Sequence, residues 1–411
     1  FMPPTDVIVI GAGAAGLAAT EALVSLGKTV TCIEAGNRVG GRVFTDTETF
    51  GLPFDRGAHW LHNGAINAFI DKGKALGLDL YPAPNHTLTA GDDPTGSALW
   101  AEVDAMSEAM RREARAGHDV ALSSLFQPLT DWSHTAAMMH MLPMGRNLHE
   151  ISIKDFADYE ESPDWFCRQG YGTLVAQYAA DIPVTLGTTV TAITTTAEGV
   201  EVKTNNGTLT ARAAIVTVSQ GILAAGDIRF DPPLAPDHLD AIGAITLGAY
   251  NHAVLQFPPE ALPVQPDTWV TYKIDPSEDS ILRGGGALCN ISGTALCAFE
   301  NAGDFATELE HAGPDAAIDY ALSRLVEVFG TDLKSAFLKG AATAWGRDPL
   351  FKGSYSAAMP GQAHKRPLLR QPHAERVFFA GEATHDAEPG TVSGAHKEGL
   401  RAAEEVAALL G

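Results

Sequence analysis

The segment Asp6-Val-Ile-Val-Ile-Gly-Ala-Gly-Ala-Ala-Gly16 decides the fold, because a short apolar strand runs directly into a glycine-rich turn. A helical pattern and a second strand at residues 29–34 follow. Gly11 allows the tight turn, Gly13 lets a pyrophosphate approach the backbone, and Gly16 lets the helix pack on the strand. This order predicts an α/β dinucleotide-binding unit with the phosphates at the positive end of the helix.

The residues after the second strand indicate which dinucleotide is bound. Glu34 lies 18 residues after Gly16, where a carboxylate accepts hydrogen bonds from an adenosine ribose. Gly40, Gly41 and Arg42 then supply a second close backbone approach and a fixed cation. These features suit the long, extended FAD better than a nicotinamide cofactor, so we predict FAD.

Composition and charge exclude several classes of protein. The 411 residues suffice for two to three domains, and 45% hydrophobic with 19% charged residues is typical of a folded chain. The 28 basic and 50 acidic side chains give a formal net charge of −22. Such a field repels phosphate backbones and anionic lipids, so neither nucleic acid nor a membrane is expected as a partner. It weakly favours cationic ligands.

Cysteine usage predicts neither a disulfide framework nor a metal site. The chain has four well-separated cysteines, Cys32, Cys167, Cys289 and Cys297, and no CxxC pair. Cys289 and Cys297 could meet across a hairpin, but we expect two buried free thiols.

The apolar stretch 7–20 is too short and glycine-rich to span a membrane, and we expect a cytoplasmic protein. Phe1 before Met2 suggests a processed or engineered start.

The rest of the chain predicts a second domain inserted into the first. Antiparallel strands are expected at 184–193 and 200–209, helices at 97–138 and 316–329, further strands at 253–299, and a closing strand and helix from Val377 to Leu410. We predict a Rossmann-like FAD-binding domain of glutathione-reductase-type topology, interleaved with an α+β substrate-binding domain. The FAD-binding domain would comprise residues 1–75, 166–247 and 366–411, and the substrate-binding domain residues 76–165 and 248–365.

Seven segments in this order resemble the flavin-dependent amine oxidase family, which includes monoamine oxidases, polyamine oxidases and histone lysine demethylases. They are the Gly11 motif, Gly40-Gly-Arg42, Asp55-Arg-Gly-Ala-His-Trp60, Gln169-Gly-Tyr-Gly172, Ala214-Ile-Val-Thr-Val-Ser219, Trp345 with Gly353-Ser-Tyr-Ser356, and Phe379-Ala-Gly-Glu382 through Gly390-Thr-Val-Ser-Gly-Ala395. The resemblance covers most of the chain. Residues 97–147 have no clear counterpart in it.

The resemblance implies a set of residues that bind FAD. They are Gly11, Gly13, Ala15, Gly16, Glu34, Gly41, Arg42, His59, Trp60, Val190, Glu382, Thr391 and Val392. Glu382 matches an acid that usually bonds the ribityl or pyrophosphate region, and Thr391 and Val392 begin a helix whose dipole stabilises negative charge on the flavin. Gly36 stands where arginine is frequent, so adenine contacts are expected to be weaker or rearranged. Ser354 stands where covalently flavinylated monoamine oxidases carry cysteine, which predicts non-covalent FAD.

The resemblance also implies an amine site. Tyr355 matches an aromatic residue in the wall of the substrate pocket, and Trp345 matches a tryptophan near the flavin edge. The alternative interpretation is that both are aromatic residues of the hydrophobic core. Thr391 replaces the second tyrosine of monoamine oxidases, so a paired aromatic cage is expected to be absent. Trp60-Leu-His62 is similar to a polyamine oxidase segment, and His62 is either a contact for the substrate nitrogen or a hydrogen-bonded core histidine.

One position departs sharply from the family. His252 stands where a lysine usually holds a water near flavin N5 and is implicated in reaction with oxygen. Histidine titrates near neutral pH whereas lysine usually stays cationic, so we expect a different oxygen reactivity or pH dependence. An amine dehydrogenase with another electron acceptor is also compatible with this residue.

The implied function is oxidation of a primary or secondary amine to an imine, and then to an aldehyde or ketone, with O2 reduced to H2O2. A polyamine or another elongated cationic amine is slightly favoured as the small-molecule substrate, although the sequence identifies no carboxylate for a distal ammonium. The chain would act as a monomer or homodimer. An L-amino-acid oxidase that uses Arg168 or Arg347 is a competing interpretation, and so is a non-catalytic flavin-binding protein. Demethylation of protein lysines is disfavoured, since no inserted helical arm is present.

Overall fold

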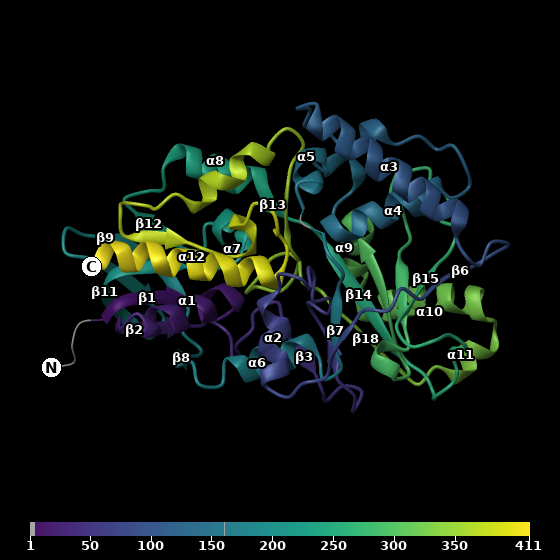
Figure 1. Ribbon diagram of the computed structural model, residues 1–411, viewed down its shortest axis with the longest axis horizontal. Helices are drawn as coiled ribbons and strands as arrows, with labels where there is room; N and C mark the ends of the chain where they lie inside the picture. Colours follow the sequence, from purple (N-terminus) through teal and green to yellow (C-terminus); the bar gives the residue numbers. More distant parts are fainter. Residues whose placement is uncertain (1–4, 160) are drawn as a thin grey trace.

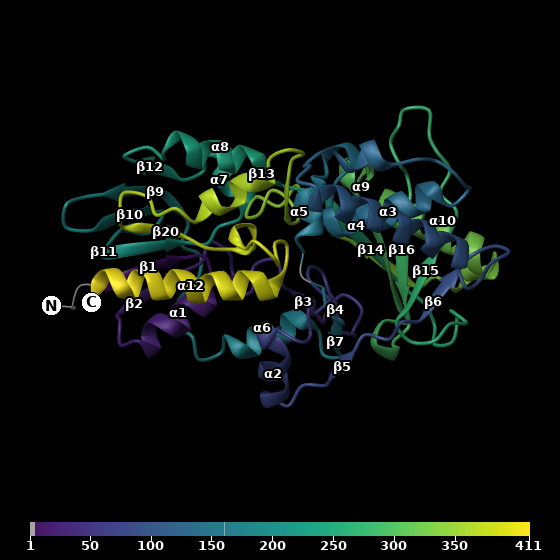
Figure 2. The ribbon, with the colours of Figure 1, turned by 45° about the horizontal axis from the view of Figure 1, so that its top comes forward.

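Two β-sheets lie side by side along the long axis of the molecule, each with its own helices (Figure 1). The computed structural model describes residues 5–159 and 161–411. Phe1 and Met2, whose order suggests a processed start, lie outside the described residues. Figure 2 shows the same arrangement from a second side, with α12 along the first sheet and α3 over the second.

The larger sheet has eight strands in the order β12-β9-β10-β11-β1-β2-β8, with β20 also paired to β11. The strands are β1 (Thr5–Ile10), β2 (Val30–Ile33), β8 (Val184–Thr185), β9 (Val190–Thr195), β10 (Val200–Thr204), β11 (Gly207–Val216), β12 (Arg229–Asp231) and β20 (Val377–Phe379). β1 runs parallel to β2 and β11, as the nucleotide-binding pattern predicts. The sheet is therefore of the Rossmann-like class.

The strands expected at 184–193 and 200–209 are each divided. β8 pairs in parallel with β2 at one edge, whereas β9 pairs antiparallel with β10, on the other side of the sheet. Residues 200–209 contain a hairpin, because Asn205-Asn206-Gly207 turns the chain from β10 into β11. The alternating pattern identified strand residues but did not show where one strand ended.

Helices cover both faces of the larger sheet. α1 (Ala14–Ser25) and α12 (Val392–Leu410) pack together on one face (Figure 1). Leu17 and Val406 are fully buried there in one core with Val7 and Val9. α7 (Gln220–Ala225) and α8 (Pro236–Ala244) cover the other face. The small residues of α1 allow this close packing, which places its N-terminus at the end of β1.

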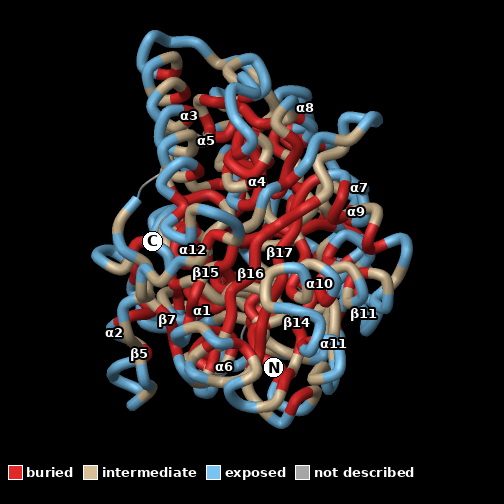
Figure 3. The backbone as a smooth tube through the Cα atoms, turned by 90° about the vertical axis from the view of Figure 1, so that its right-hand side faces the viewer, coloured by how far each residue is buried: buried red, intermediate tan, exposed pale blue. Residues whose placement is uncertain are grey.

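The second sheet has the strand order β18-β14-β17-β16-β15-β6. These strands are β6 (Thr87–Thr89), β14 (Tyr250–Gln256), β15 (Thr268–Thr271), β16 (Gly286–Cys289), β17 (Leu296–Ala302) and β18 (Lys339–Ala342). All seven residues of β17 are buried, and the central strands lie deep in the molecule (Figure 3). α9 (Gly303–Ala312), α10 (Pro314–Phe329) and α11 (Asp332–Ala336) contribute to the core on one face, and α3 (Ser97–Arg115), α4 (Ser133–Met144) and α5 (Ile153–Ala157) to a second core.

Short elements complete the structure. They are β3 (Thr45–Asp46), β4 (Phe54–Asp55), α2 (Ala68–Ala75), β5 (Leu80–Pro82), η1 (Leu122–Leu125), η2 (Leu148–Glu150), β7 (Trp165–Cys167), α6 (Tyr171–Tyr178), β13 (Ile245–Leu247), η3 (Ile291–Gly293), β19 (Ser356–Ala358), η4 (Ala363–Arg370) and η5 (Glu382–Thr384). All four cysteines are buried and free, and Cys289 and Cys297 face each other across β16 and β17. No described helix is long and apolar enough to cross a membrane.

The two sheets draw on different parts of the chain. Every strand of the larger sheet lies within 1–75, 166–247 or 366–411, and every strand of the second within 76–165 or 248–365. We keep these ranges as our division into domains. The helical residues 97–115 and 133–144 cover the second sheet, and they lie within 97–147, the range for which the resemblance gave no clear counterpart.

Candidate active site

A cavity of about 1120 Å³ runs from the glycine-rich turn to the second sheet. Its walls include the five residues proposed for catalysis, His62, His252, Trp345, Tyr355 and Thr391. They also include every residue proposed to bind FAD except Gly16. Residues from segments far apart in the sequence therefore meet around one space.

The glycine-rich turn leaves room for a ligand only because its glycines lack side chains. Gly11 has a φ of +103°, which side chains disfavour. A Cβ on Gly16 would lie 1.8 Å from the carbonyl oxygen of Gly11, so Gly16 serves packing rather than contact with the cavity. The Glu34 carboxylate accepts hydrogen bonds from the N–H groups of Ala12 (2.8 Å) and Gly36 (2.7 Å), which fix it at the cavity wall.

A cation and a helix terminus lie further along the cavity. Arg42 Nη1 donates to a carboxylate oxygen of Glu382 (3.0 Å) and to the carbonyl of Ser354 (2.6 Å). Thr391 is the N-cap of α12, and its hydroxyl oxygen accepts a hydrogen bond from Gly394 N (2.9 Å). The positive end of α12 thus faces the cavity beside Val392, as required for stabilising negative charge on a flavin.

The donors and space at this end fit non-covalent FAD. Glu34, the close backbones of Gly13 and Gly41, and Arg42 suit its ribose and pyrophosphate. No described cysteine lines the cavity, and Ser354 donates its hydroxyl to the carbonyl of Gly248 (2.9 Å). A protein thiol is therefore not placed to attach the flavin.

Two histidines lie near Asp55. The side-chain carboxylate of Asp55 pairs with Nδ1 of His59 (2.8 Å), and the Asp55 backbone favours the charged form of the His252 imidazole. The Nε2 atoms of His59 and His252 are buried without a hydrogen-bond partner. Burial, with the neighbouring His59, lowers the pKa of His252 to about 4, so this imidazole is neutral at physiological pH.

Aromatic side chains form much of the remaining wall. Trp345 donates its indole N–H to the carbonyl of Arg56 (3.1 Å). Tyr355 donates its hydroxyl to the carbonyl of Leu142, and its ring centroid lies 5.5 Å from that of Tyr250. Tyr159, which the sequence did not point to, has a buried hydroxyl without a partner and lies with Tyr355 beside Gly390. Tyrosines from other segments thus surround Tyr355, although position 391 holds threonine.

His62 is not a core histidine. Its side chain is 47% exposed and lines the cavity, with Nδ1 3.1 Å from Asp164. The surrounding protein disfavours its charged form, but the hydrogen bond and charge of Asp164 outweigh this and raise the pKa of His62. The ring stacks on Trp60, with centroids 6.5 Å apart and an interplanar angle of 7°.

Glu300 is the candidate residue that the sequence analysis missed. It lies on β17 directly opposite His252 on β14, lines the cavity, and is 8% exposed. Burial raises its pKa to about 7, against hydrogen bonds from Tyr250 and Trp60 that favour the charged form. A single acidic residue within a strand of buried side chains is the signal that could have identified it.

The cavity is strongly asymmetric in charge. Among the described residues that line it, Arg42 is the only lysine or arginine, whereas the acidic residues of the wall include Glu161, Asp164 and Glu300. Arg168 and Arg347 are absent from these walls. Arg168 pairs with Asp79 (2.6 Å) and Arg347 donates to the carbonyl of Glu310 (3.3 Å). The structure therefore places neither arginine where it could hold a substrate carboxylate.

A Rossmann-like sheet and a cavity whose walls hold the residues that suit FAD point to an FAD-dependent oxidoreductase, and comparison with known proteins identifies the family. Residues 102–407 match the model of the flavin-containing amine oxidoreductases, and residues 9–72 match that of an NAD(P)-binding Rossmann-like domain. The chain belongs to the flavin-containing amine oxidoreductase family. It is an enzyme of that family with FAD as its non-covalent cofactor.

Several relatives align over nearly the whole chain. Polyamine oxidase 2 of Arabidopsis thaliana is 28% identical over 436 residues, which cover 97% of this chain and 87% of that protein. Lysine-specific histone demethylase 1 homolog 1 of Oryza sativa subsp. japonica is 30% identical over 451 residues, covering 98% of this chain but 52% of the demethylase homolog.

Solved structures share the fold. Cyclohexylamine oxidase from Brevibacterium oxydans IH-35A superposes with a TM-score of 0.83 and 22% identity, over 99% of this chain and 100% of that one. Putrescine oxidase bound to putrescine superposes with a TM-score of 0.81 and 19% identity, over 99% of each chain. These similarities confirm the Rossmann-like architecture predicted from the glycine-rich segment.

Proposed function

We propose that the enzyme oxidises amines that carry a second positive charge, such as linear diamines and polyamines, with O2 as the electron acceptor. The observation that carries the proposal is Glu300, a buried carboxylate on a cavity wall where Arg42 is the only lysine or arginine among the described lining residues. A buried anion of this kind is stabilised by a cation that the substrate supplies. We propose that the distal ammonium of the substrate is that cation.

The reacting nitrogen must have a lone pair, because FAD would supply the acceptor for a hydride from the carbon beside a neutral amine. Tyr355 and Trp345 supply an apolar, aromatic surface that disfavours an ammonium at that position. The unpartnered Nε2 atoms of His59 and His252 are free to accept hydrogen bonds from the N–H groups of the substrate. The aromatic residues position the reacting end, and Glu300 with the His62–Asp164 pair positions the charged end.

The same charges disfavour an L-amino-acid oxidase. An amino-acid substrate needs a cation for its carboxylate, and Arg42 is already held by Glu382 and Ser354. A substrate carboxylate near Glu300 or Asp164 would meet negative charge. We therefore propose amines without a carboxylate as substrates.

A second candidate is an amine dehydrogenase with an acceptor other than O2. It is favoured by His252, because a neutral imidazole supplies no positive charge for the reduction of oxygen. Its distinguishing property is a reduced flavin that persists in air and is reoxidised by an artificial acceptor.

Anaerobic stopped-flow absorbance tests both candidates. The purified yellow protein is mixed with 1,4-diaminobutane, spermidine, n-butylamine and an L-amino acid, and air is then admitted. We expect the flavin band to bleach fastest with the diamine or triamine and to return in air. Equal bleaching by butylamine would contradict the assignment of Glu300, and no bleaching by any amine would contradict catalysis. A cytoplasmic location and a monomeric or homodimeric state remain proposals from the sequence.

A further inference from the structure

A buried chain of alternating charges connects the substrate side of the cavity to the residues beside FAD. It begins at Asp155 on α5, passes through Arg366 on η4 and Ser356 on β19 to Glu382 on η5, and ends at Arg42. Asp155, Ser356, Arg366 and Glu382 are each at most 6% exposed. Two carboxylates and two guanidiniums balance in charge, so the chain is neutral as a whole.

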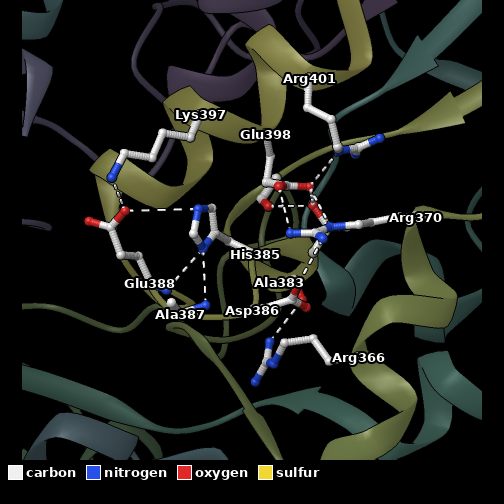
Figure 4. A network of polar contacts seen from close by, with 12 residues as sticks. Arg366, Arg370, Ala383, His385, Asp386, Ala387, Glu388, Lys397, Glu398 and Arg401 are labelled. Carbon is white, nitrogen blue, oxygen red and sulfur yellow. Dashed lines mark hydrogen bonds and ion pairs between the residues drawn. The ribbon is translucent and has the colours of Figure 1, made fainter. Parts of the chain in front are cut away.

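Each connection in this chain is a direct hydrogen bond. Arg366 binds Asp155 through Nε (3.0 Å) and Nη2 (2.8 Å to each oxygen), and its Nη1 donates to the Ser356 hydroxyl (3.0 Å). The same Nη1 donates to the carbonyl of Ala383 (2.8 Å), a contact visible in Figure 4. The Ser356 hydroxyl in turn donates to Oε2 of Glu382 (2.7 Å). Ala383 directly follows Glu382, so Arg366 holds both the backbone and the side chain of η5.

The Glu382 carboxylate has no acceptor site left for a ligand. Oε1 accepts from Arg42 Nη1 (3.0 Å) and Ser356 N (3.1 Å), and Oε2 accepts from the Ser356 hydroxyl (2.7 Å) and Gly390 N (2.8 Å). A carboxylate offers about four lone-pair sites, and the protein occupies all of them. Glu382 therefore acts on FAD through its partners, namely Arg42 and the backbone that begins α12.

We propose that Arg366 and Ser356 are positioning residues that hold Glu382 so that it aims Arg42 and the first residues of α12 at FAD, and that Asp155 ties this arrangement to the substrate wall. α5 carries Phe156 and leads to Tyr159, and both line the cavity. Ordering of the FAD site is thereby coupled to ordering of the substrate site. The proposal depends on FAD binding and not on which amine is oxidised.

The decisive experiment measures the dissociation constant of FAD by titrating apoprotein, beside the thermal midpoint of the apoprotein. Ser356→Ala removes the connection but leaves the buried Arg366–Asp155 pair intact. Thr384→Ala is the matched control, since Thr384 lies on the same η5 and its buried hydroxyl bonds Glu398 (2.6 Å) and the Gly381 carbonyl (2.9 Å), whereas the described partners of the Glu382 carboxylate do not include it. Figure 4 shows that cluster, with Arg370 and Arg401 around Glu398.

We expect Ser356→Ala to weaken FAD binding about tenfold and Thr384→Ala less than twofold, with similar apoprotein midpoints. FAD should also slow hydrogen exchange at residues 153–158 in the wild type but not in Ser356→Ala. An unchanged dissociation constant in Ser356→Ala, or equal weakening in Thr384→Ala, would overturn the proposal. Arg366→Lys, which keeps the charge but loses the forked geometry, should weaken FAD binding as well. If this variant does not fold, the comparison of the FAD dissociation constants of Ser356→Ala and Thr384→Ala decides the test.

Discussion

Replacing Glu300 by glutamine tests the proposed function most directly, because the change removes one charge and keeps the shape. A buried hydrogen bond between a carboxylate and an ammonium contributes about 1.5–3 kcal/mol, which corresponds to a fall of about 10- to 150-fold in kcat/KM. The fall should appear for 1,4-diaminobutane and spermidine but not for n-butylamine, which has no second charge. Initial rates of flavin bleaching with each amine, measured without oxygen, give the comparison.

The pH dependence supplies an independent check on the same residue. Since the pKa of Glu300 is raised to about 7, its anionic fraction grows as pH rises through 7. The kcat/KM for the diamine should therefore rise more steeply between about pH 6 and 8 in the wild type than in Glu300→Gln, because deprotonation of the reacting amine raises both and ionisation of Glu300 raises only the wild type.

The control is Glu161→Gln. Glu161 also lines the cavity, but its side chain is 68% exposed and pairs with Arg111, so a change of less than about twofold is expected. Equal losses for monoamine and diamine in Glu300→Gln, or an equal effect of Glu161→Gln, would refute the reasoning.

Three further predictions concern stability, oxygen and FAD binding. The pKa of Glu300 is about 7 in the folded protein and near 4.5 in the unfolded chain, so ionisation of Glu300 lowers the free energy of unfolding of the wild type by up to about 3 kcal/mol above pH 7. Denaturant unfolding of the apoprotein should therefore give Glu300→Gln a higher free energy of unfolding than the wild type at pH 8 and an equal one at pH 4.5. His252→Lys should speed reoxidation of the reduced enzyme by O2 about tenfold in stopped flow, and no acceleration would show that charge at this position does not limit the step. Gly16→Ala should abolish FAD binding, because its Cβ would lie 1.8 Å from Gly11 O, whereas Gly243→Ala on α8, with nothing within 4 Å, should add about 0.5–1 kcal/mol to stability.

The FAD end of the site was predictable because its determinants are local in sequence. A turn such as Gly11–Gly16 has one backbone geometry wherever it joins a strand to a helix, so six residues suffice to predict the phosphate end. The same holds for Thr391, which caps a helix that starts at the next residue. In each case neighbours in the sequence are also the neighbours that create the function.

The substrate end was only partly predictable because its residues meet through strand register. Glu300 faces the cavity beside His252 because β14 and β17 pair with those residues opposite each other, and a shift of one residue would turn Glu300 away. Tyr159 reaches Gly390 from a segment far earlier in the chain. The prediction of a single strand at 184–193 was wrong for the same reason, since the sequence pattern does not reveal that β8 and β9 lie at opposite sides of one sheet.

In the proposed binding mode the two amino groups of the substrate have opposite requirements, and this favours a particular shape of substrate. At the reacting end, the aromatic surface of Tyr355 and Trp345 lowers the pKa of an ammonium and favours the neutral amine. At the other end, ionised Glu300 raises the pKa of an ammonium and keeps it charged. A monoamine can satisfy only one of these environments, and it is held most firmly where it cannot react. In the proposed binding mode, a molecule with two separated amino groups satisfies both requirements at once, because the charge held at Glu300 would anchor the neutral nitrogen at the flavin.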